Sequence, residues 1–188
     1  MNTLEAIKAR KSVRSYQDKP VESEKIKAIV EAGNMAAMTP MAGKTYFNVI
    51  TNPALLNQIK EGTRTVMQNS GVDMLVKISS NPAFNPIYGA PVAVVVSVDQ
   101  AADPNTQSMA TQNAASASAN MLIAATELGL GSCYLMSPTM AFHVPAIREA
   151  AKLPENAQPV SLIVFGYTED TMPHKERPEN PANIIYVD

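Results

Sequence analysis

Apolar residues recur with a helical period near the start of the chain, which predicts two short helices. Asn2 and Glu5 have the spacing of a capping box, in which each side chain bonds the other residue's backbone N–H. A second helix is predicted from Ser23 to Gly33, because one face is apolar and glycine commonly follows a helix. The chain therefore opens with two helices joined by a short connection.

Runs of β-branched and aromatic residues predict strands farther along the chain. The clearest is Pro91–Val98, a valine-rich apolar run that suits a strand buried in the centre of a sheet. Further strands are predicted at residues 45–51, 132–136, 160–165 and 184–187. Helices are predicted to begin at Asn52-Pro53 and to span residues 107–128 and 138–151. Two Asn-Pro pairs predict that residues 62–89 form a loop-rich cover over an active site.

The order of these elements predicts the fold class. Helices and strands are mixed along the chain, but the regular strand–helix–strand alternation of a doubly wound fold is missing. We therefore expect one α+β domain over residues 1–188, with an antiparallel-rich central sheet flanked by helices.

Composition narrows the classes of partner. Hydrophobic residues make up 46% of the 188 residues, charged residues only 17%, and the net charge is −2. This balance gives no reason to expect nucleic acid or a membrane as partner. The chain has one cysteine, its first residues read as an amphipathic helix and not a signal peptide, and no apolar run is long enough to span a membrane. We expect a cytoplasmic protein.

The connection between the first two helices is the first candidate site. It reads Arg10-Lys11-Ser12-Val13-Arg14, with three cations and a hydroxyl within five residues. In an extended chain Arg10, Ser12 and Arg14 would share one face, which suits a phosphate because guanidinium groups bind phosphate bidentately. Taken alone, the pattern favours a solvated basic patch, since cations near a helix C-terminus are common.

Other candidates are also ambiguous when each is taken alone. The Gly129-Leu130-Gly131 turn suits a close approach to a flat ligand or a simple helix end, and the pair Lys175 and Arg177 suits a phosphate or a soluble loop. Cys133 lies between apolar residues without a telling histidine spacing, so we interpret it as buried packing. The sequence also lacks a nucleophile elbow, a P-loop and a His/Cys metal pattern. A redox cofactor would not require such groups, because it carries its own chemistry.

Several segments together resemble the nitroreductase family of flavoproteins. Residues 7–16, followed by Pro20-Val21, are similar to the family's opening R-R-S-x-R-x-[FY] motif and the P-[VI] pair after it. The later motifs follow in the family's order: Gly89-Ala90-Pro91 into the valine-rich strand, the long helix ending at Gly129-Leu130-Gly131-Ser132-Cys133, Phe165-Gly166-Tyr167, and Lys175-x-Arg177-Pro178. The match covers nearly the whole chain, and the order and spacing are more specific than any single motif.

The resemblance implies an FMN-dependent oxidoreductase with a nitroreductase-like fold. FMN would be bound non-covalently at the interface of a homodimer, and NADH or NADPH would serve as the electron donor. In the family's ping-pong mechanism the donor gives a hydride to flavin N5 and leaves. A small-molecule oxidant, such as a nitroaromatic or a quinone, then takes the electrons. No protein side chain and no metal is expected to carry the chemistry.

The resemblance also implies a set of flavin contacts by motif position. Phosphate and ribityl would be held by Arg10, Lys11, Ser12 and Arg14, with Lys175 and Arg177 completing the phosphate site. The ring would lie beside Asn85, the backbone of Leu135 and Met136, and Gly131.

One segment departs from the family pattern. Many members carry a polar N-x-Q-P-W-like segment after the second helix, which contacts the partner subunit's flavin. This chain has the apolar segment Met35–Lys44 instead. Contacts from Met38, Thr39 and Pro40 are still expected through backbone groups.

The last strand and the exact activity remain expectations of the resemblance. The strand at 184–187 is expected to join the other subunit's sheet.

Three alternatives to this function remain open. They are another flavin enzyme on this fold (an enone reductase, a dehalogenase or a flavin-fragmenting enzyme), a flavin-binding or storage protein without turnover, and a non-redox protein that binds phosphate-bearing ligands. The sequence does not separate NADH from NADPH or name the oxidant.

Overall fold

The computed structural model describes residues 1–170 and 184–187, and its centre is a four-stranded sheet in the order β1-β2-β4-β3. All neighbouring strands are antiparallel. The strands are β1 (Thr45–Ile50), β2 (Val92–Asp99), β3 (Gly131–Leu135) and β4 (Ala157–Gly166). The prediction of an α+β fold with an antiparallel-rich sheet is confirmed.

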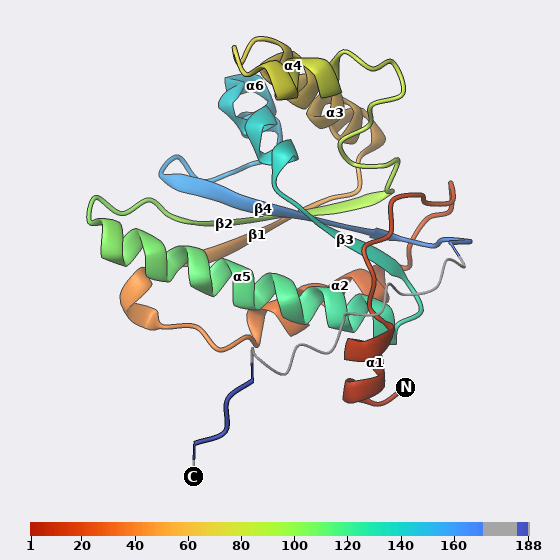
Figure 1. Ribbon diagram of the computed structural model, residues 1–188, viewed down its shortest axis with the longest axis vertical. Helices are drawn as coiled ribbons and strands as arrows, with labels where there is room; N and C mark the ends of the chain where they lie inside the picture. Colours follow the sequence, from red (N-terminus) through yellow and green to blue (C-terminus); the bar gives the residue numbers. More distant parts are fainter. Residues whose placement is uncertain (171–183, 188) are drawn as a thin grey trace.

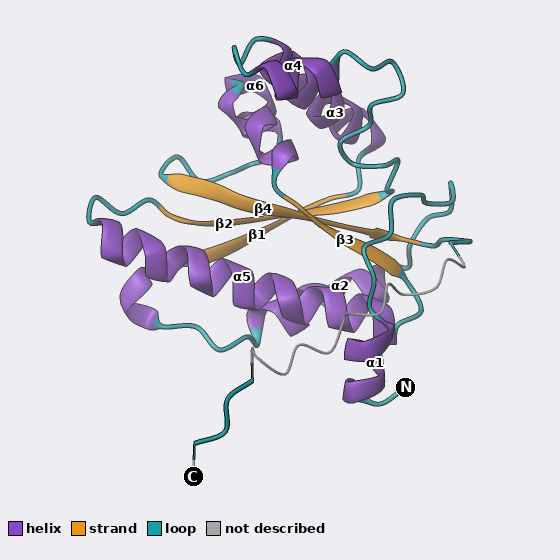
Figure 2. Cartoon of the chain, viewed as in Figure 1, coloured by secondary structure: helices purple, strands orange, loops and turns teal. Residues whose placement is uncertain are grey.

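Helices cover both faces of the sheet, as Figures 1 and 2 show. The lower layer in Figure 1 contains α1 (Thr3–Ala9), α2 (Ser23–Asn34), the short 3-10 helix η1 (Pro40–Ala42) and α5 (Pro104–Glu127). The upper layer contains α3 (Pro53–Gln68), α4 (Asp73–Ser79), the 3-10 helix η2 (Ser137–His143) and α6 (Pro145–Ala150). The sheet is therefore buried on both sides.

The valine-rich run explains the centre of the fold. Side chains alternate across a strand, so β2 supplies Val95 to the upper core and Val94 and Val96 to the lower core. All three valines have no exposed surface. The lower core is completed by small residues of α5, which let this helix lie close to the sheet.

Two expectations about the helices need correction, and a third is confirmed. The stretch 62–89 contains the end of α3, which continues to Gln68, and the whole of α4; loops remain at residues 69–72 and from Ser80 onward. The helix expected at 138–151 is divided into η2 and α6, since Pro145 has no N–H and must start a new helix. The capping box of Asn2 and Glu5 is confirmed, with distances of 3.0 and 2.8 Å.

The expected last strand is absent from the single chain. Residues 184–187 are exposed and form no ladder with any residue that the structure describes. The exchange of this segment between subunits stays a prediction.

Within the described ranges, none of the helices combines the length and hydropathy that crossing a bilayer needs.

Candidate functional site

The basic segment lies as an extended chain along β3. Arg10 ends α1 through a bond from its backbone N–H to the oxygen of Ala6. Ser12 then forms a parallel bridge with Ser132, and the N–H of Val13 donates to the Ser132 oxygen at 2.9 Å. Because the pairing is parallel, the segment runs in the same direction as β3.

The alternation of side chains places Arg10, Ser12 and Arg14 on one face, as predicted. All three act on the thiol of Cys133, which is buried in β3. Burial raises the pKa of this thiol, while the Arg14 charge, a hydrogen bond with the Ser12 side chain and the Arg10 charge oppose the rise. The positive charge of the segment therefore acts on a buried thiol in β3, the edge strand of the sheet.

Lys11 points to the other face. Its Nζ donates to the backbone oxygen of Asp170 at 2.7 Å and forms an ion pair with the Asp170 carboxylate at 3.2 Å. Lys11 and Val13 line a small cavity of about 150 Å³ together with Gly131 and Thr168. A Cβ on Gly131 would lie 2.9 Å from side-chain atoms of both Val13 and Thr168, so only glycine fits here.

Two tyrosines, which the sequence analysis did not select, complete the face with the arginines. Tyr16 is mostly buried and donates from its hydroxyl to the oxygen of Val13 at 3.0 Å; burial raises its pKa strongly. The Arg14 guanidinium lies 5.9 Å from the ring centre of Tyr88. Tyr88 has a φ of 56°, an uncommon value for a bulky residue and one often found at functional sites. In the sequence, its position before Gly89 was the only indication of an unusual backbone conformation at Tyr88.

Asn85 belongs to the same turn as Tyr88. The Tyr88 N–H donates to the backbone oxygen of Asn85 at 3.1 Å, and the Asn85 side chain accepts from the N–H of Ile87 at 3.1 Å. Asn85 also lines a cavity of about 480 Å³ beside Lys19 and Lys60. The turn thus joins Asn85 to Tyr88, whose ring lies near Arg14.

The C-terminal end of β3 holds the next two predicted residues. Leu135 is buried in the upper core, whereas Met136 is 68% exposed at the start of η2. The five residues from Gly131 to Leu135 span roughly 13 Å of strand, and side-chain alternation places Gly131 and Leu135 on the same face of β3. Lys175 and Arg177 lie outside the described residues.

The segment Met35–Lys44 lies far from the basic segment in the same chain. The Asn113 side chain of α5 accepts from the Thr39 N–H and donates to the Thr39 oxygen, both at 2.9 Å. At the other end of α5, the N-terminal ammonium of Met1, which precedes α1, pairs with Glu127 at 3.2 Å. Asn113 and Glu127 are 14 positions apart on this helix, or roughly 20 Å. Figure 1 shows the two segments at opposite ends of α5.

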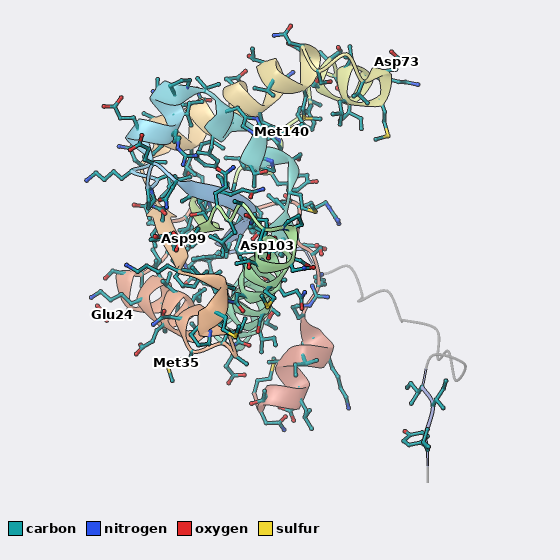
Figure 3. The ribbon with its side chains drawn as sticks, turned by 90° about the vertical axis from the view of Figure 1, so that its left-hand side faces the viewer. Glu24, Met35, Asp73, Asp99, Asp103 and Met140 are labelled. Atoms are coloured by element: carbon teal, nitrogen blue, oxygen red, sulfur yellow. The ribbon has the colours of Figure 1, made fainter. Side chains whose placement is uncertain are left out.

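Two methionines of this segment face outward, whereas Ala42 is buried in the lower core. Met35 is 76% exposed and Met41 is 79% exposed. In Figure 3, Met35 projects away from the lower helices. The backbone groups of Thr39 are bound to Asn113, so this segment presents methionine side chains more than free backbone groups.

Known proteins of one family share the sequence pattern and the fold of this chain. The family model described as "Nitroreductase family" matches residues 7–167. A protein of Methanothermobacter thermautotrophicus named putative NADH dehydrogenase/NAD(P)H nitroreductase is 30% identical over 167 residues, covering 89% of this chain and 78% of its own length. A nitroreductase of Bacteroides fragilis, whose crystal structure contains bound FMN, is 28% identical with a TM-score of 0.88, and each chain is covered completely. The predicted nitroreductase-like fold is confirmed, and the chain belongs to the nitroreductase family.

Proposed function

We propose that the protein is an FMN-dependent oxidoreductase that uses NADH or NADPH to reduce nitroaromatic, quinone or similar acceptors by a ping-pong reaction. The observation that carries the proposal is the face formed by Arg10, Ser12 and Arg14. Within the part of the chain that the structure describes, neither arginine pairs with a carboxylate. Two available guanidinium groups beside a hydroxyl fit a phosphate monoester well.

The residues around this face fit the rest of FMN. The segment that carries the proposed phosphate donors pairs with β3 at Ser132. From there β3 runs on to Leu135, next to Met136. The turn of Asn85 and Tyr88 lies beside Arg14. The site thus combines a charged end with polar and apolar groups along a strand, as a flavin mononucleotide requires. Bound FMN would supply the hydride chemistry, while these residues bind and orient it.

We infer that the second part of the site comes from another copy of this chain. In one chain the Met38–Pro40 segment lies roughly 20 Å along α5 from the α1 end, so a single copy does not bring the two together. A homodimer would bring Met38, Thr39 and Pro40 of one subunit to the flavin of the other.

Removing residues 180–188 is expected to weaken this dimer, because the segment 184–187 is proposed to join the other subunit's sheet. A shortened chain whose dimer dissociation constant is unchanged would contradict the exchanged strand.

The visible spectrum of the purified protein tests the function. We expect a yellow protein, or one that becomes yellow with added FMN, whose absorption bleaches with NADH or NADPH without oxygen. The colour should return when a nitroaromatic or a quinone is added. A yellow protein that neither donor bleaches would indicate flavin binding without this turnover, and a protein that stays colourless with FMN would contradict the proposal.

A further inference from the structure

Lys11 differs from the other cations of the basic segment in its surroundings. Arg10 and Arg14 share one side of the extended chain with Ser12, and Arg14 lies near the Tyr88 ring, whereas Lys11 reaches Asp170 on the other side. The packing of Val13 against Gly131 and Thr168 fixes this division, because the side chains at 11 and 13 share a face. A phosphate on the arginine face therefore lies across the backbone from Lys11.

Asp170 is part of a larger contact between residues 11–17 and 167–170. The N–H of Gln17 donates to the Tyr167 oxygen at 2.9 Å, and the Thr168 hydroxyl donates to the Ser15 oxygen at 2.8 Å. The same hydroxyl accepts from the Asp170 N–H at 3.0 Å. Lys11 closes the end of this contact nearest α1.

The Lys11–Asp170 pair is sheltered enough to matter. The two side chains are 25% and 21% exposed, so water and salt screen the charges less than at an open surface. To reach a phosphate on the arginine face, Lys11 would have to break both its bond to the Asp170 backbone oxygen and its ion pair with the Asp170 carboxylate.

We infer that Lys11 is a positioning residue and not a phosphate ligand. Its bonds to Asp170 hold the basic segment against β3, and the segment in this position turns Arg10, Ser12 and Arg14 toward the flavin phosphate. The inference rests on the proposed function for its ligand, and it changes the role that the family resemblance implies for Lys11.

Asp170→Asn separates the two roles by the sign of its effect. If Lys11 positions the segment, losing the Asp170 charge loosens the segment, and FMN binding weakens by about five- to tenfold, the scale of one partly sheltered charged bond. If Lys11 is a phosphate ligand, the same change releases it from a competing carboxylate, and FMN binding is unchanged or tighter. The dissociation constant is measured by titrating flavin-free full-length protein into FMN and following the flavin fluorescence.

Glu169→Gln is the matched control. It removes a carboxylate from the neighbouring residue, while its amide oxygen can still accept the bond from Gln17. Any general effect of removing negative charge near a phosphate appears in this variant as well. Lys11→Met should weaken FMN binding as much as Asp170→Asn, and the double variant should be no weaker than Lys11→Met alone, since both remove one interaction.

Amide exchange at Val13 provides a readout that needs no flavin. In flavin-free protein, Asp170→Asn should speed exchange of the Val13 N–H, which bonds Ser132, while Ala93 in β2 stays protected. Unchanged Val13 exchange, or tighter FMN binding by Asp170→Asn than by Glu169→Gln, would overturn the inference. Wild-type protein that binds no FMN would instead refute the proposed function, and Val13 exchange would still report whether Asp170 holds the segment.

Discussion

The basic segment 10–16 and the methionine segment 35–44 differ in both chemistry and support. The first is cationic and is held by backbone bonds to β3 and by the Lys11–Asp170 pair. The second is rich in apolar residues. The Asn113 side chain binds it at Thr39, and the side chain and backbone N–H of Asp99 bind it at Lys44. Under the proposed function, the first segment would anchor the charged cofactor and the second would present an adaptable surface to the acceptor.

The largest effect is expected from Arg10→Ala. Losing one charged hydrogen bond to phosphate should weaken FMN binding by about 1.5–3 kcal/mol, because the proposed ligand is a dianion. Isothermal titration of flavin-free protein measures this change. Lys8→Ala is the control, since Lys8 is an exposed cation in the last turn of the same helix. Equal FMN affinity in the two variants would mean that Arg10 does not bind the phosphate.

Asn113→Ala tests the support of the methionine segment. The substitution leaves the Thr39 N–H without its partner and should lower the free energy of unfolding by about 1–3 kcal/mol. FMN affinity should change less than in Arg10→Ala, while the KM for the acceptor should rise. Asn120→Ala is the matched control, because Asn120 lies on the same helix and makes a single bond to the Ala32 oxygen at 3.1 Å. Equal acceptor KM values in the two variants would argue against a special role of Asn113.

The same two segments show which features the sequence could predict. The face shared by Arg10, Ser12 and Arg14 follows from strand periodicity, which depends only on neighbouring residues. The partner of Lys11 is 159 positions away, so no local pattern could identify it. Asn113 likewise lies within an Ala- and Ser-rich helix, and only the packed fold brings its amide to Thr39.

The fold shows a similar limit. The valine-rich β2 was predictable because burial on both faces demands an apolar run. The helices in 62–89 were missed because α4 is short, and because the Asn-Pro pairs that suggested loops lie after it. The position of α4 depends on a non-local contact, because Arg64 of α3 donates to the backbone oxygens of Ser79 and Asn81 at 3.1 Å.

Met41→Gln should alter acceptor use more than stability. Met41 is 79% exposed in one chain, so the free energy of unfolding should change by less than about 0.5 kcal/mol. The kcat/KM for an apolar quinone should fall about threefold, the scale of one methylene's transfer energy, while FMN affinity stays constant. Met74→Gln is the control, because Met74 is similarly exposed, at 65%, on the distant α4. An equal fall of kcat/KM in both variants would contradict a role of the 35–44 segment in acceptor binding.

The smallest effect is the acid sensitivity of the methionine segment. A hydrogen bond from the Lys44 N–H, followed by one from the Tyr46 hydroxyl, lowers the pKa of Asp99 from its usual 3.8. A lowered folded-state pKa means that ionised Asp99 stabilises the fold above about pH 4, and that this contribution is lost as pH falls through the lowered value. The stability difference between wild type and Asp99→Asn should therefore shrink in urea titrations below pH 4.

Asp103→Asn separates acid sensitivity from support of the segment. Asp103 caps α5 through the Thr106 N–H and hydroxyl, and these bonds also lower its pKa. Both variants should lose part of the acid dependence of stability, but only Asp99→Asn should also raise the acceptor KM, because only Asp99 holds the Lys44 end of the methionine segment. If Asp99→Asn left that KM unchanged, Asn113 would be the one side chain of this pair on which acceptor use depends, and the contrast with the basic segment would narrow to it.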